Sequence, residues 1–221
     1  MRLKFALAFL LLCGFLLSCA RSDLQDIQEL DGYAVLPAAQ ADEQEATFAG
    51  GCFWAMQECM IQLKGVKKAI SGYAGGSTVN PTYEGVLGGN TGHAEAVQVY
   101  YDPKVISFEQ LTNAFFQAHD PTQLNRQGPD VGSDYRSIAF YRNQGEYKSL
   151  LGVRKKLDSL VFKNQIVTEL MLIDKFYPAE MEHQDYYKRH NWEPYIRRVS
   201  KPKVRKLQQS MPEMIKSEYL E

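Results

Sequence analysis

The sequence predicts an α+β fold of the split βαβ type, in which helices pack on a mostly antiparallel mixed sheet and extended loops join the elements. Three observations lead to this class. Apolar segments with the pattern of strands alternate with segments of helical period. Their order is βαββαβ, with further helical material after it, and Gly-, Asn- and Pro-rich stretches separate them. This order favours a ferredoxin-like sandwich with the helices on one face of the sheet.

Each element follows from its local pattern. Ser107 and Gln110 form a capping box that starts one helix, and Asn143 with Glu146 starts another. We expect the second helix to turn Leu150, Leu151, Leu157 and Leu160 inward. The expected elements are a strand over 46–50, a helix over 52–63, a strand over 66–73, a long loop over 75–92, a strand over 94–101, a helix after 107, an irregular stretch over 119–134, a strand over 135–141, a helix after 143 and a strand over 167–173.

Composition describes one ordinary globular domain with appendages. The chain has 221 residues, of which 45% are hydrophobic and 23% charged. That apolar share excludes an intrinsically disordered chain, and 16 glycines without a period exclude a collagen-like one. The net charge of −1 gives no basic field for nucleic acid, so we expect no nucleic-acid partner.

The start of the chain has the layout of a targeting segment. Arg2 and Lys4 precede an apolar run over 5–17, which is too short to span a bilayer as a helix. The run ends in Leu-Leu-Ser-Cys-Ala, which resembles the lipobox of bacterial lipoproteins, with Cys19 as the lipidated residue. We expect a signal peptide over 1–18 and a lipid anchor that holds the protein to a membrane of the cell envelope. The alternative is an ordinary secretory signal with an incidental cysteine.

Two polar segments flank the expected catalytic domain over 45–199. Residues 19–44 hold the lipidated cysteine and an acidic stretch without sustained apolar period, which predicts a flexible tether. Residues 200–221 are basic and polar, and we interpret the charges as a solvated surface.

Chemistry concentrates where the first strand turns into the first helix. Gly50 and Gly51 permit a sharp turn, and Cys52 follows at a helix N-terminus. Unpaired N–H groups and the helix dipole favour the thiolate there, as a nucleophilic cysteine requires. The alternative, a small buried hydrophobic residue, is the interpretation we prefer for Cys59, deeper in the same helix.

Aromatic and acidic side chains accompany this cysteine. Phe53 and Trp54 follow it directly and can form a cup for a small alkyl group of a substrate. Glu95 begins a strand, and Tyr83 and Tyr135 lie on loops. An acid and two phenols near a nucleophile predict a site that donates protons to a substrate oxygen.

Five segments in order resemble the peptide methionine sulfoxide reductase A family. The resemblance covers about residues 45–200. The matching segments are Gly51-Cys52-Phe53-Trp54, Asn80-Pro81-Thr82-Tyr83-Glu84, Gly92-His93-Ala94-Glu95 with Tyr101-Asp102-Pro103, Asp130-Val131-Gly132 with Tyr135-Arg136-Ser137, and His183-Gln184 with Tyr186. Enzymes of this class reverse the oxidation of methionine to its sulfoxide.

The resemblance implies a role for each residue of the site. Cys52 attacks the sulfoxide sulfur of the S epimer, which leaves methionine and a sulfenic acid on the cysteine. Phe53 and Trp54 hold the S-methyl group, Glu95, Tyr83 and Tyr135 protonate or hydrogen-bond the departing oxygen, and Asp130 orders the site. Glu95 must then be protonated, which burial beside aromatic rings can bring about by raising its pKa.

The chain departs from the family pattern at three positions near the site. Gln57 stands where the family usually has Glu, Asp134 where Gln commonly precedes Tyr-Arg-Ser, and Glu182 where an aromatic residue commonly precedes His-Gln. None of these changes removes a catalytic group.

The more consequential departure is that residues 191–221 contain no cysteine, whereas many family members keep a resolving cysteine there. Cys59 is seven residues along the helix from Cys52, at about 10.5 Å. A disulfide needs Cα atoms about 4.4 to 6.8 Å apart. We therefore expect a cycle with one cysteine, in which an external small thiol or a thioredoxin-like protein reduces the sulfenic acid.

Other chemistries have weaker support. The four histidines do not have a zinc-binding spacing, so we expect no metal and no bound cofactor. They are His93, His119, His183 and His190. Two alternatives remain, a cysteine-dependent hydrolase with a Cys–His dyad and a lipoprotein that binds oxidised methionine peptides without catalysis. We expect the protein to act as a monomer on oxidised proteins or peptides.

Overall fold

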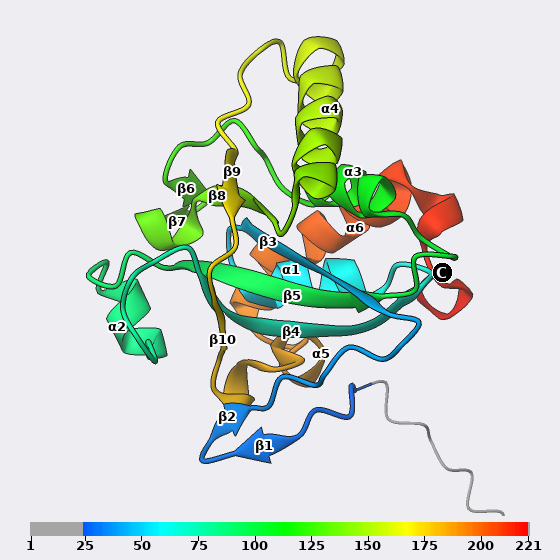
Figure 1. Ribbon diagram of the computed structural model, residues 1–221. Coiled ribbons are helices and arrows are strands. Elements are labelled where there is room, and N and C mark those ends of the chain that lie inside the picture. The colour runs from blue at the N-terminus through cyan, green and yellow to red at the C-terminus, as the bar shows by residue number, and fades with distance from the viewer. Residues whose placement is uncertain (1–23, 221) are drawn as a thin grey trace, which may run out of the picture.

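The computed structural model describes residues 24–220, and a six-stranded mixed sheet forms its centre (Figure 1). All neighbouring strands run antiparallel except β8 and β9, which are parallel. Across the sheet the strands are β10 (Phe176–Pro178), β4 (Val66–Ala74), β5 (Ala94–Tyr101), β3 (Gln44–Gly50), β8 (Ser137–Tyr141) and β9 (Glu169–Leu172). The inner order β4-β5-β3-β8 is that of a split βαβ fold, so the predicted fold class is confirmed.

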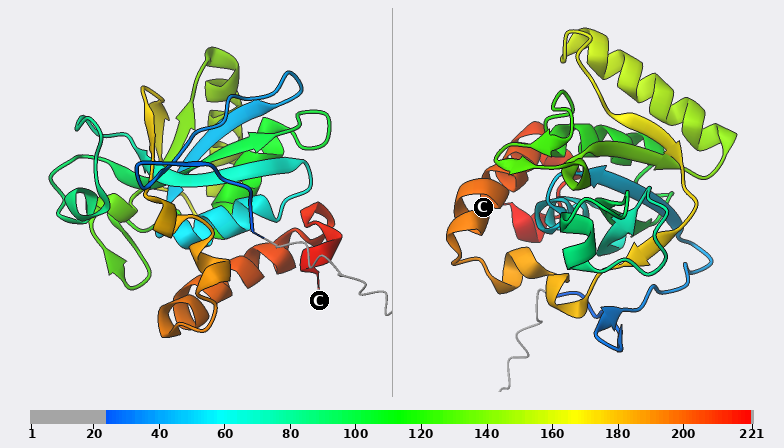
Figure 2. Two further views of the ribbon diagram at one scale, coloured as in Figure 1. Left: turned by 90° about the horizontal axis from the view of Figure 1, so that it is seen from below. Right: turned by 90° about the vertical axis from the view of Figure 1, so that its left-hand side faces the viewer.

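Three helices cover one side of this sheet. Figure 2 shows α1, α3 and α6 on the same side, and α1 packs against β4 and β5 while α3 packs against β3. The helices are α1 (Phe53–Ile61), α2 (Tyr83–Leu87), α3 (Phe108–Ala118), α4 (Gln144–Leu160), α5 (Tyr186–Arg189) and α6 (Lys201–Ser210). Short turns of other helix types are the 3₁₀ turns η1 (Ser133–Tyr135), η2 (Met181–His183), η4 (Pro212–Met214) and η5 (Ser217–Tyr219), and the π-helical turn η3 (Ile196–Ser200).

The predicted caps form as expected. Ser107 Oγ accepts a hydrogen bond from the backbone N–H of Gln110, whose side chain bonds back to the N–H of Ser107 at 2.9 Å. The side chain of Asn143 accepts from the N–H of Glu146 at the start of α4. One prediction about α4 is wrong, because Leu160 is 74% exposed rather than turned inward. Leu157, one turn earlier, still packs against the core, whereas the end of the helix stands away from the sheet (Figure 1).

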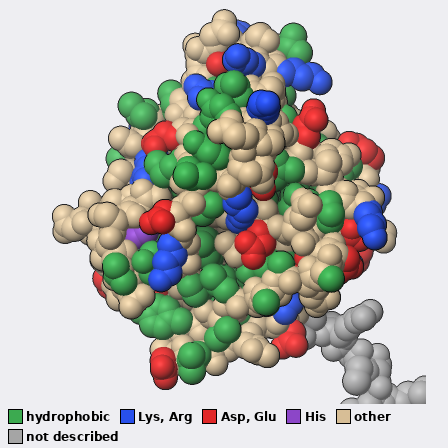
Figure 3. Space-filling view, viewed as in Figure 1, with side chains coloured by type: hydrophobic (Ala, Val, Ile, Leu, Met, Phe, Trp, Pro, Cys, Tyr) green, Lys and Arg blue, Asp and Glu red, His purple; other side chains and the backbone are tan. Residues whose placement is uncertain are grey.

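The apolar side chains form two clusters, one on each face of the sheet. The larger one fills the space between the sheet and α1, α3 and α6, with Phe48, Phe115 and Leu207 among its fully buried members. The smaller one lies on the opposite face and includes Ile70, Tyr100 and Phe140. Figure 3 shows hydrophobic side chains gathered on the side where β10 and the N-terminal segment lie, and basic side chains on α4 at the top.

The N-terminal segment differs from the expected flexible tether. Residues 24–43 include the short strands β1 (Glu29–Leu30) and β2 (Tyr33–Ala34), and they run along the outer edge of the sheet (Figure 1). Gln25 exchanges hydrogen bonds with the backbone of Ala69 at 2.8 and 2.9 Å and donates twice to the carboxylate of Asp185 at 2.8 Å. An apolar period in the sequence predicts only the burial of apolar side chains. These contacts are hydrogen bonds between polar groups, so the sequence pattern did not predict that the segment attaches to the sheet.

The C-terminal segment also differs from the expected solvated tail. Val204 and Leu207 of α6 are buried against α1 and α3. Pro202 lies in the first turn of the helix. A backbone N–H at this position has no acceptor within the helix, so the lack of an N–H in proline costs no hydrogen bond. The basic residues of this segment therefore stand on an ordered helix, and the Nζ atom of one of them, Lys203, is buried.

The predicted lipidation at Cys19 and the signal peptide over 1–18 lie outside the described residues. Across residues 24–220, none of the helices combines the length and apolar character that a membrane crossing requires.

Candidate active site

A tight turn at the end of β3 presents Cys52. Gly51 has a φ of +81°, in the left-handed region that favours glycine, and a side chain there would collide with Gln127. Cys52 is the N-cap of α1, as the sequence predicts, and is only 5% exposed. The sulfur therefore lies at the start of a helix and beneath the protein surface.

Glu95 lies directly beside this helix start. It shares the face of β5 that carries Val97 and Val99, so its side chain points toward α1. Its Oε2 accepts a hydrogen bond from the backbone N–H of Phe53 at 2.8 Å. Glu95 as a residue is 2% exposed. The N–H of Phe53 is one of the groups at the start of α1 that have no partner within the helix, and it holds this buried acid next to the thiol.

Burial raises the pKa of Glu95 from its ordinary 4.5 to about 8. The hydrogen bond from Phe53 opposes this shift, and the negative charges of Asp134 and Asp130 add to it. At neutral pH the group is thus mostly a neutral acid, able to give a proton to a substrate oxygen.

Cys52 differs from the sequence expectation of a stabilised thiolate. Burial raises the pKa of its thiol to about 12, and the charge of Glu95 adds to the effect. A hydrogen bond with Tyr195, the charge of Lys203 and the backbone N–H of Trp54 lower the pKa, but by less than burial raises it. The helix N-terminus alone does not decide the protonation state, because the loss of water around the sulfur outweighs it.

Two predicted tyrosines surround the same atoms. Burial raises the pKa of Tyr83 and of Tyr135, and the charges of Glu95 and Cys52 add to the shift in both. Tyr83 is held by its backbone N–H, which donates to Glu180 at 3.0 Å. Both phenols therefore stay protonated at neutral pH and can donate hydrogen bonds.

A third phenol, Tyr195, was not predicted. Its hydroxyl donates to Asp130 Oδ2 at 2.6 Å and lies within hydrogen-bonding reach of Cys52. It stands in the segment Trp192-Glu193-Pro194-Tyr195, whose aromatic residues in a polar surrounding were the only signal in the sequence. Asp130, on β7 (Asp130–Val131) of a hairpin with β6 (Arg126–Gln127), thus orders this phenol.

Aromatic rings form one wall of the site. Trp54 stacks on Tyr186 with ring centroids 3.8 Å apart and also contacts the ring of Tyr195 edge-on. Phe53 is fully buried beneath it and packs against Tyr83 and His183 at 6.2 and 5.4 Å. Trp54, which is partly exposed, is therefore the aromatic surface available to a small alkyl group, and Phe53 supports it from below.

The histidines near the site have other partners than Cys52. His183 Nδ1 accepts from Trp54 Nε1 at 3.4 Å, and His93 bonds to the backbone of Gly76 and Thr78. His119 bonds to Phe115 O and to Ser137 Oγ, both at 2.7 Å. None of these hydrogen bonds joins a histidine to Cys52, and residues 24–220 hold no cluster of three or more His, Cys, Asp or Glu side chains that could bind a metal ion.

Cys59 is also a free cysteine and is completely buried in α1. The helix is unbroken from Phe53 to Ile61, so the separation from Cys52 follows the regular helical rise. Burial raises the pKa of the Cys59 thiol to about 12, as expected for a core residue.

The structure thus gathers the predicted residues around one sulfur atom. Five separate segments of the chain contribute these residues, which are Cys52, Glu95, Tyr83, Tyr135 and Asp130. A buried thiol, a neutral acid and three phenols beside an aromatic wall can reduce a polar S=O group that carries a small alkyl substituent.

Comparison with known proteins agrees with this chemistry. The model of the peptide methionine sulfoxide reductase family matches residues 44–215. The chain belongs to this family. Peptide methionine sulfoxide reductase MsrA of Natronomonas pharaonis is 44% identical over 173 residues, which cover 78% of this chain and 97% of the relative. The enzyme of the same name from Pasteurella multocida is 47% identical over 175 residues, with coverages of 78% and 99%.

Solved structures of the family share the fold. Mxr1 from Saccharomyces cerevisiae in reduced form superposes with a TM-score of 0.67 at 34% identity, covering 71% of this chain and 91% of that one. Methionine sulfoxide reductase A of Corynebacterium diphtheriae gives 0.63 at 32% identity, with coverages of 70% and 78%. Yeast Mxr1 in complex with Trx2 gives 0.50 at 27% identity, with coverages of 68% and 89%. The chain is therefore a thiol-dependent oxidoreductase that reduces peptide methionine sulfoxide.

Proposed function

We propose that this reductase acts on the S epimer of methionine sulfoxide in oxidised proteins and peptides and passes through a sulfenic acid on Cys52. The observation that supports this most strongly is the contact between Glu95 and the start of α1, which sets a neutral acid beside the thiol. A sulfoxide sulfur becomes electrophilic only when its oxygen is protonated or strongly hydrogen-bonded. The nucleophile and the acid must therefore act together.

The reaction balances within the site. The Cys52 sulfur attacks the sulfoxide sulfur while Glu95 gives its proton to the oxygen, and the proton that the thiol releases replaces the one that Glu95 gave. The oxygen then passes to Cys52, so that the thiol and the sulfoxide become a sulfenic acid and the thioether of methionine. Tyr83 and Tyr135 stabilise the oxygen as charge develops on it, and Trp54 contacts the S-methyl group.

Regeneration uses external thiols in this proposal. One thiol forms a mixed disulfide with Cys52 and releases water, and a second thiol frees the enzyme as a disulfide leaves. Cys59 is buried and fixed in an unbroken helix, which supports a cycle without it. The solved complex of yeast Mxr1 with Trx2 supports a thioredoxin-like reductant.

We also propose that the enzyme is a monomer tethered to a membrane of the cell envelope through Cys19, where it repairs oxidised envelope proteins. The described domain begins at Leu24, five residues after Cys19. Five extended residues reach at most about 18 Å. A lipid anchor at Cys19 would hold the domain close to the membrane surface.

Turnover of defined epimers tests the function. The purified protein, with dithiothreitol or a thioredoxin system, receives a peptide with either the S or the R epimer of methionine sulfoxide, and chromatography follows the methionine peptide. We expect reduction of the S epimer alone, and none with Cys52→Ser. Reduction of the R epimer, or activity that survives loss of Cys52, contradicts the proposal.

Two alternatives predict other results in the same assay. A binding protein without catalysis retains the oxidised peptide with either residue at position 52 and releases no methionine peptide. A hydrolase cleaves the unoxidised peptide, which our proposal leaves intact.

A further inference from the structure

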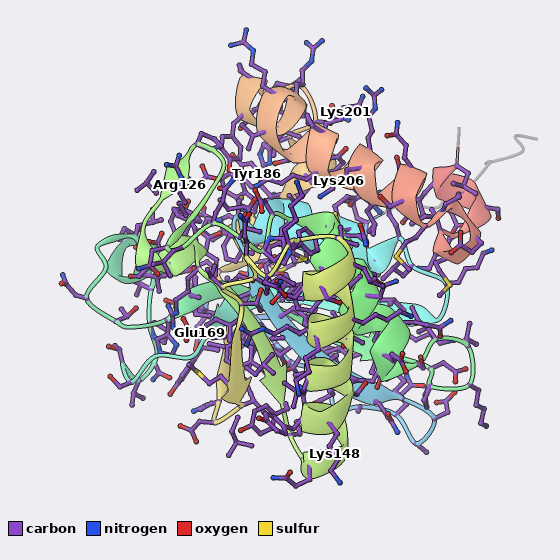
Figure 4. All side chains as sticks on the ribbon, turned by 90° about the horizontal axis from the view of Figure 1, so that it is seen from above. Arg126, Lys148, Glu169, Tyr186, Lys201 and Lys206 are labelled. Carbon is purple, nitrogen blue, oxygen red and sulfur yellow. The ribbon has the colours of Figure 1, made fainter. Side chains whose placement is uncertain are left out.

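Lys203 lies beside the nucleophile, although the reaction above gives it no role. Its Nζ is 3.6 Å from the position that a Cβ atom on Gly51 would occupy, and Gly51 directly precedes Cys52. The packing of Val204 and Leu207 on α1 and α3 fixes the helix that carries it. Figure 4 shows α6 along one edge of the molecule, with Lys206 on the side facing the rest of the domain. Residues near the C-terminus thus bring a cation to the start of α1.

The Nζ atom of Lys203 is buried and has no hydrogen-bond partner among residues 24–220. Two polar groups of the neighbouring segments already have partners. The side-chain amide of Gln127 accepts from Asp120 N–H at 3.1 Å and donates to Asp120 O at 2.9 Å. The carbonyl of His119 accepts from Lys206 Nζ at 3.2 Å. Within the described part of the chain, no carboxylate lies at ion-pair distance from Lys203.

A buried ammonium without an anion is unfavourable, so this placement is best explained by an anion that forms during the reaction. Cys52 supplies one when its thiol loses a proton before attack. We propose that Lys203 is a positioning residue that stabilises the thiolate of Cys52 and thereby increases the fraction of enzyme able to attack the sulfoxide. This inference rests on the proposed function for its biological purpose, but the thiolate can be measured without any substrate.

The charges around Cys52 agree with this assignment. Six ionisable groups act on its sulfur or feel its charge: Glu95 from β5, Tyr83 from α2, Tyr135 from η1, Tyr186 from α5, Tyr195, and Lys203 from α6. Of these six, Lys203 alone carries a positive charge. It lowers the pKa of Cys52, and it acts in the same direction on Glu95, Cys59 and His119, which places it centrally among them. Burial lowers the pKa of His119 to about 4, so that ring adds no second cation.

Alkylation of Cys52 by iodoacetamide measures the thiolate directly. Below the pKa the alkylation rate is proportional to the thiolate fraction, so a shift of one pKa unit changes the rate tenfold at any such pH. Mass spectrometry of the Cys52 peptide separates this reaction from that of Cys59. The variants are Lys203→Met, which keeps the aliphatic stem, Lys203→Arg, which keeps the charge, and Lys206→Met as a matched loss of charge from the same helix.

We expect Lys203→Met to slow alkylation of Cys52 about tenfold or more, Lys203→Arg to restore most of the rate, and Lys206→Met to leave it unchanged. The same order should appear in kcat/KM for the S-epimer peptide, and the loss in Lys203→Met should stay constant with pH below the pKa of the thiol. Equal rates in the wild type and Lys203→Met, with both folded by circular dichroism, overturn the proposal, as does an equal loss in Lys206→Met. If the wild type alkylates as expected but reduces no sulfoxide, the proposed function fails instead.

Discussion

The buried acid at the centre of the site should make the protein less stable as the pH rises, and Glu95→Gln should remove that dependence. The pKa of Glu95 is raised from 4.5 to about 8 in the folded protein. Above about pH 4.5 the unfolded chain releases this proton while the folded protein keeps it, which favours unfolding. The stability that the neutral acid contributes is thus fully present below the unfolded pKa and is lost as the pH rises through the folded pKa.

The size of the effect follows from the two pKa values. Each unit between them corresponds to about 1.4 kcal/mol, so from about pH 4.5 to about pH 7 the wild type loses about 3 kcal/mol relative to Glu95→Gln. The glutamine oxygen can still accept the bond from the N–H of Phe53. The unpaired amide donors cost about 1–3 kcal/mol, but that cost does not vary with pH.

Urea unfolding of both proteins at about pH 5, 6 and 7 measures the slope. The difference in unfolding free energy, variant minus wild type, should rise by about 1.4 kcal/mol per pH unit. Glu213→Gln is the control, since it makes the same chemical change at an exposed position and leaves the buried acid in place. A constant difference for Glu95→Gln would mean that the carboxyl is ionised in the folded protein at neutral pH and cannot donate the proton that the mechanism requires.

Four further substitutions test other parts of the account. Tyr83→Phe and Tyr135→Phe should each lower kcat by about 10²-fold with little change in KM, because each removes a donor to the developing oxyanion; unchanged kcat in both would assign proton donation to other groups. Cys59→Ser should leave steady-state turnover with a small thiol unchanged, and a stop after one turnover would identify it as the resolving cysteine. Gln184→Leu should lower the unfolding free energy by about 2–4 kcal/mol, because it leaves the N–H and C=O of buried Ser71 without their side-chain partner. Urea titration against the wild type measures this loss. A loss below about 1 kcal/mol would show that water replaces those bonds.

Local patterns were sufficient for the main elements of the fold. The Ser107 and Asn143 caps start α3 and α4 where expected, because a cap depends on residues three positions apart. Leu160 was misplaced because helical period identifies a stripe but not where the sheet beneath it ends. The N-terminal segment was missed for a related reason, since Gln25 attaches it by polar bonds to residues far along the chain.

The site shows the same division between local and distant causes. The position of Cys52 at a helix start follows from the two glycines before it, and the resemblance to the family supplied Glu95, Tyr83 and Tyr135. The pKa of the thiol did not follow, because burial by distant segments outweighs the helix N-terminus.

Tyr195 and Lys203 could not be predicted for a different reason. Each lies more than 140 residues from Cys52 in a stretch that looks like polar surface, and only the packing of the C-terminal helix brings them to the sulfur. Bonds to other distant segments account for a departure from the family pattern. Gln57 replaces the usual Glu and is buried, where its neutral amide donates to Ala69 O and accepts from the N–H of Asp185.

Intact mass after a single turnover tests the central claim most directly. The reduced protein is mixed with an excess of the S-epimer peptide and no reductant, and both the protein mass and the released methionine peptide are measured. A one-cysteine reductase yields one equivalent of methionine peptide and a protein heavier by one oxygen atom, located on Cys52. A protein lighter by two hydrogen atoms would reveal a disulfide with Cys59, and release of no methionine peptide by the folded, reduced enzyme would contradict the account as a whole.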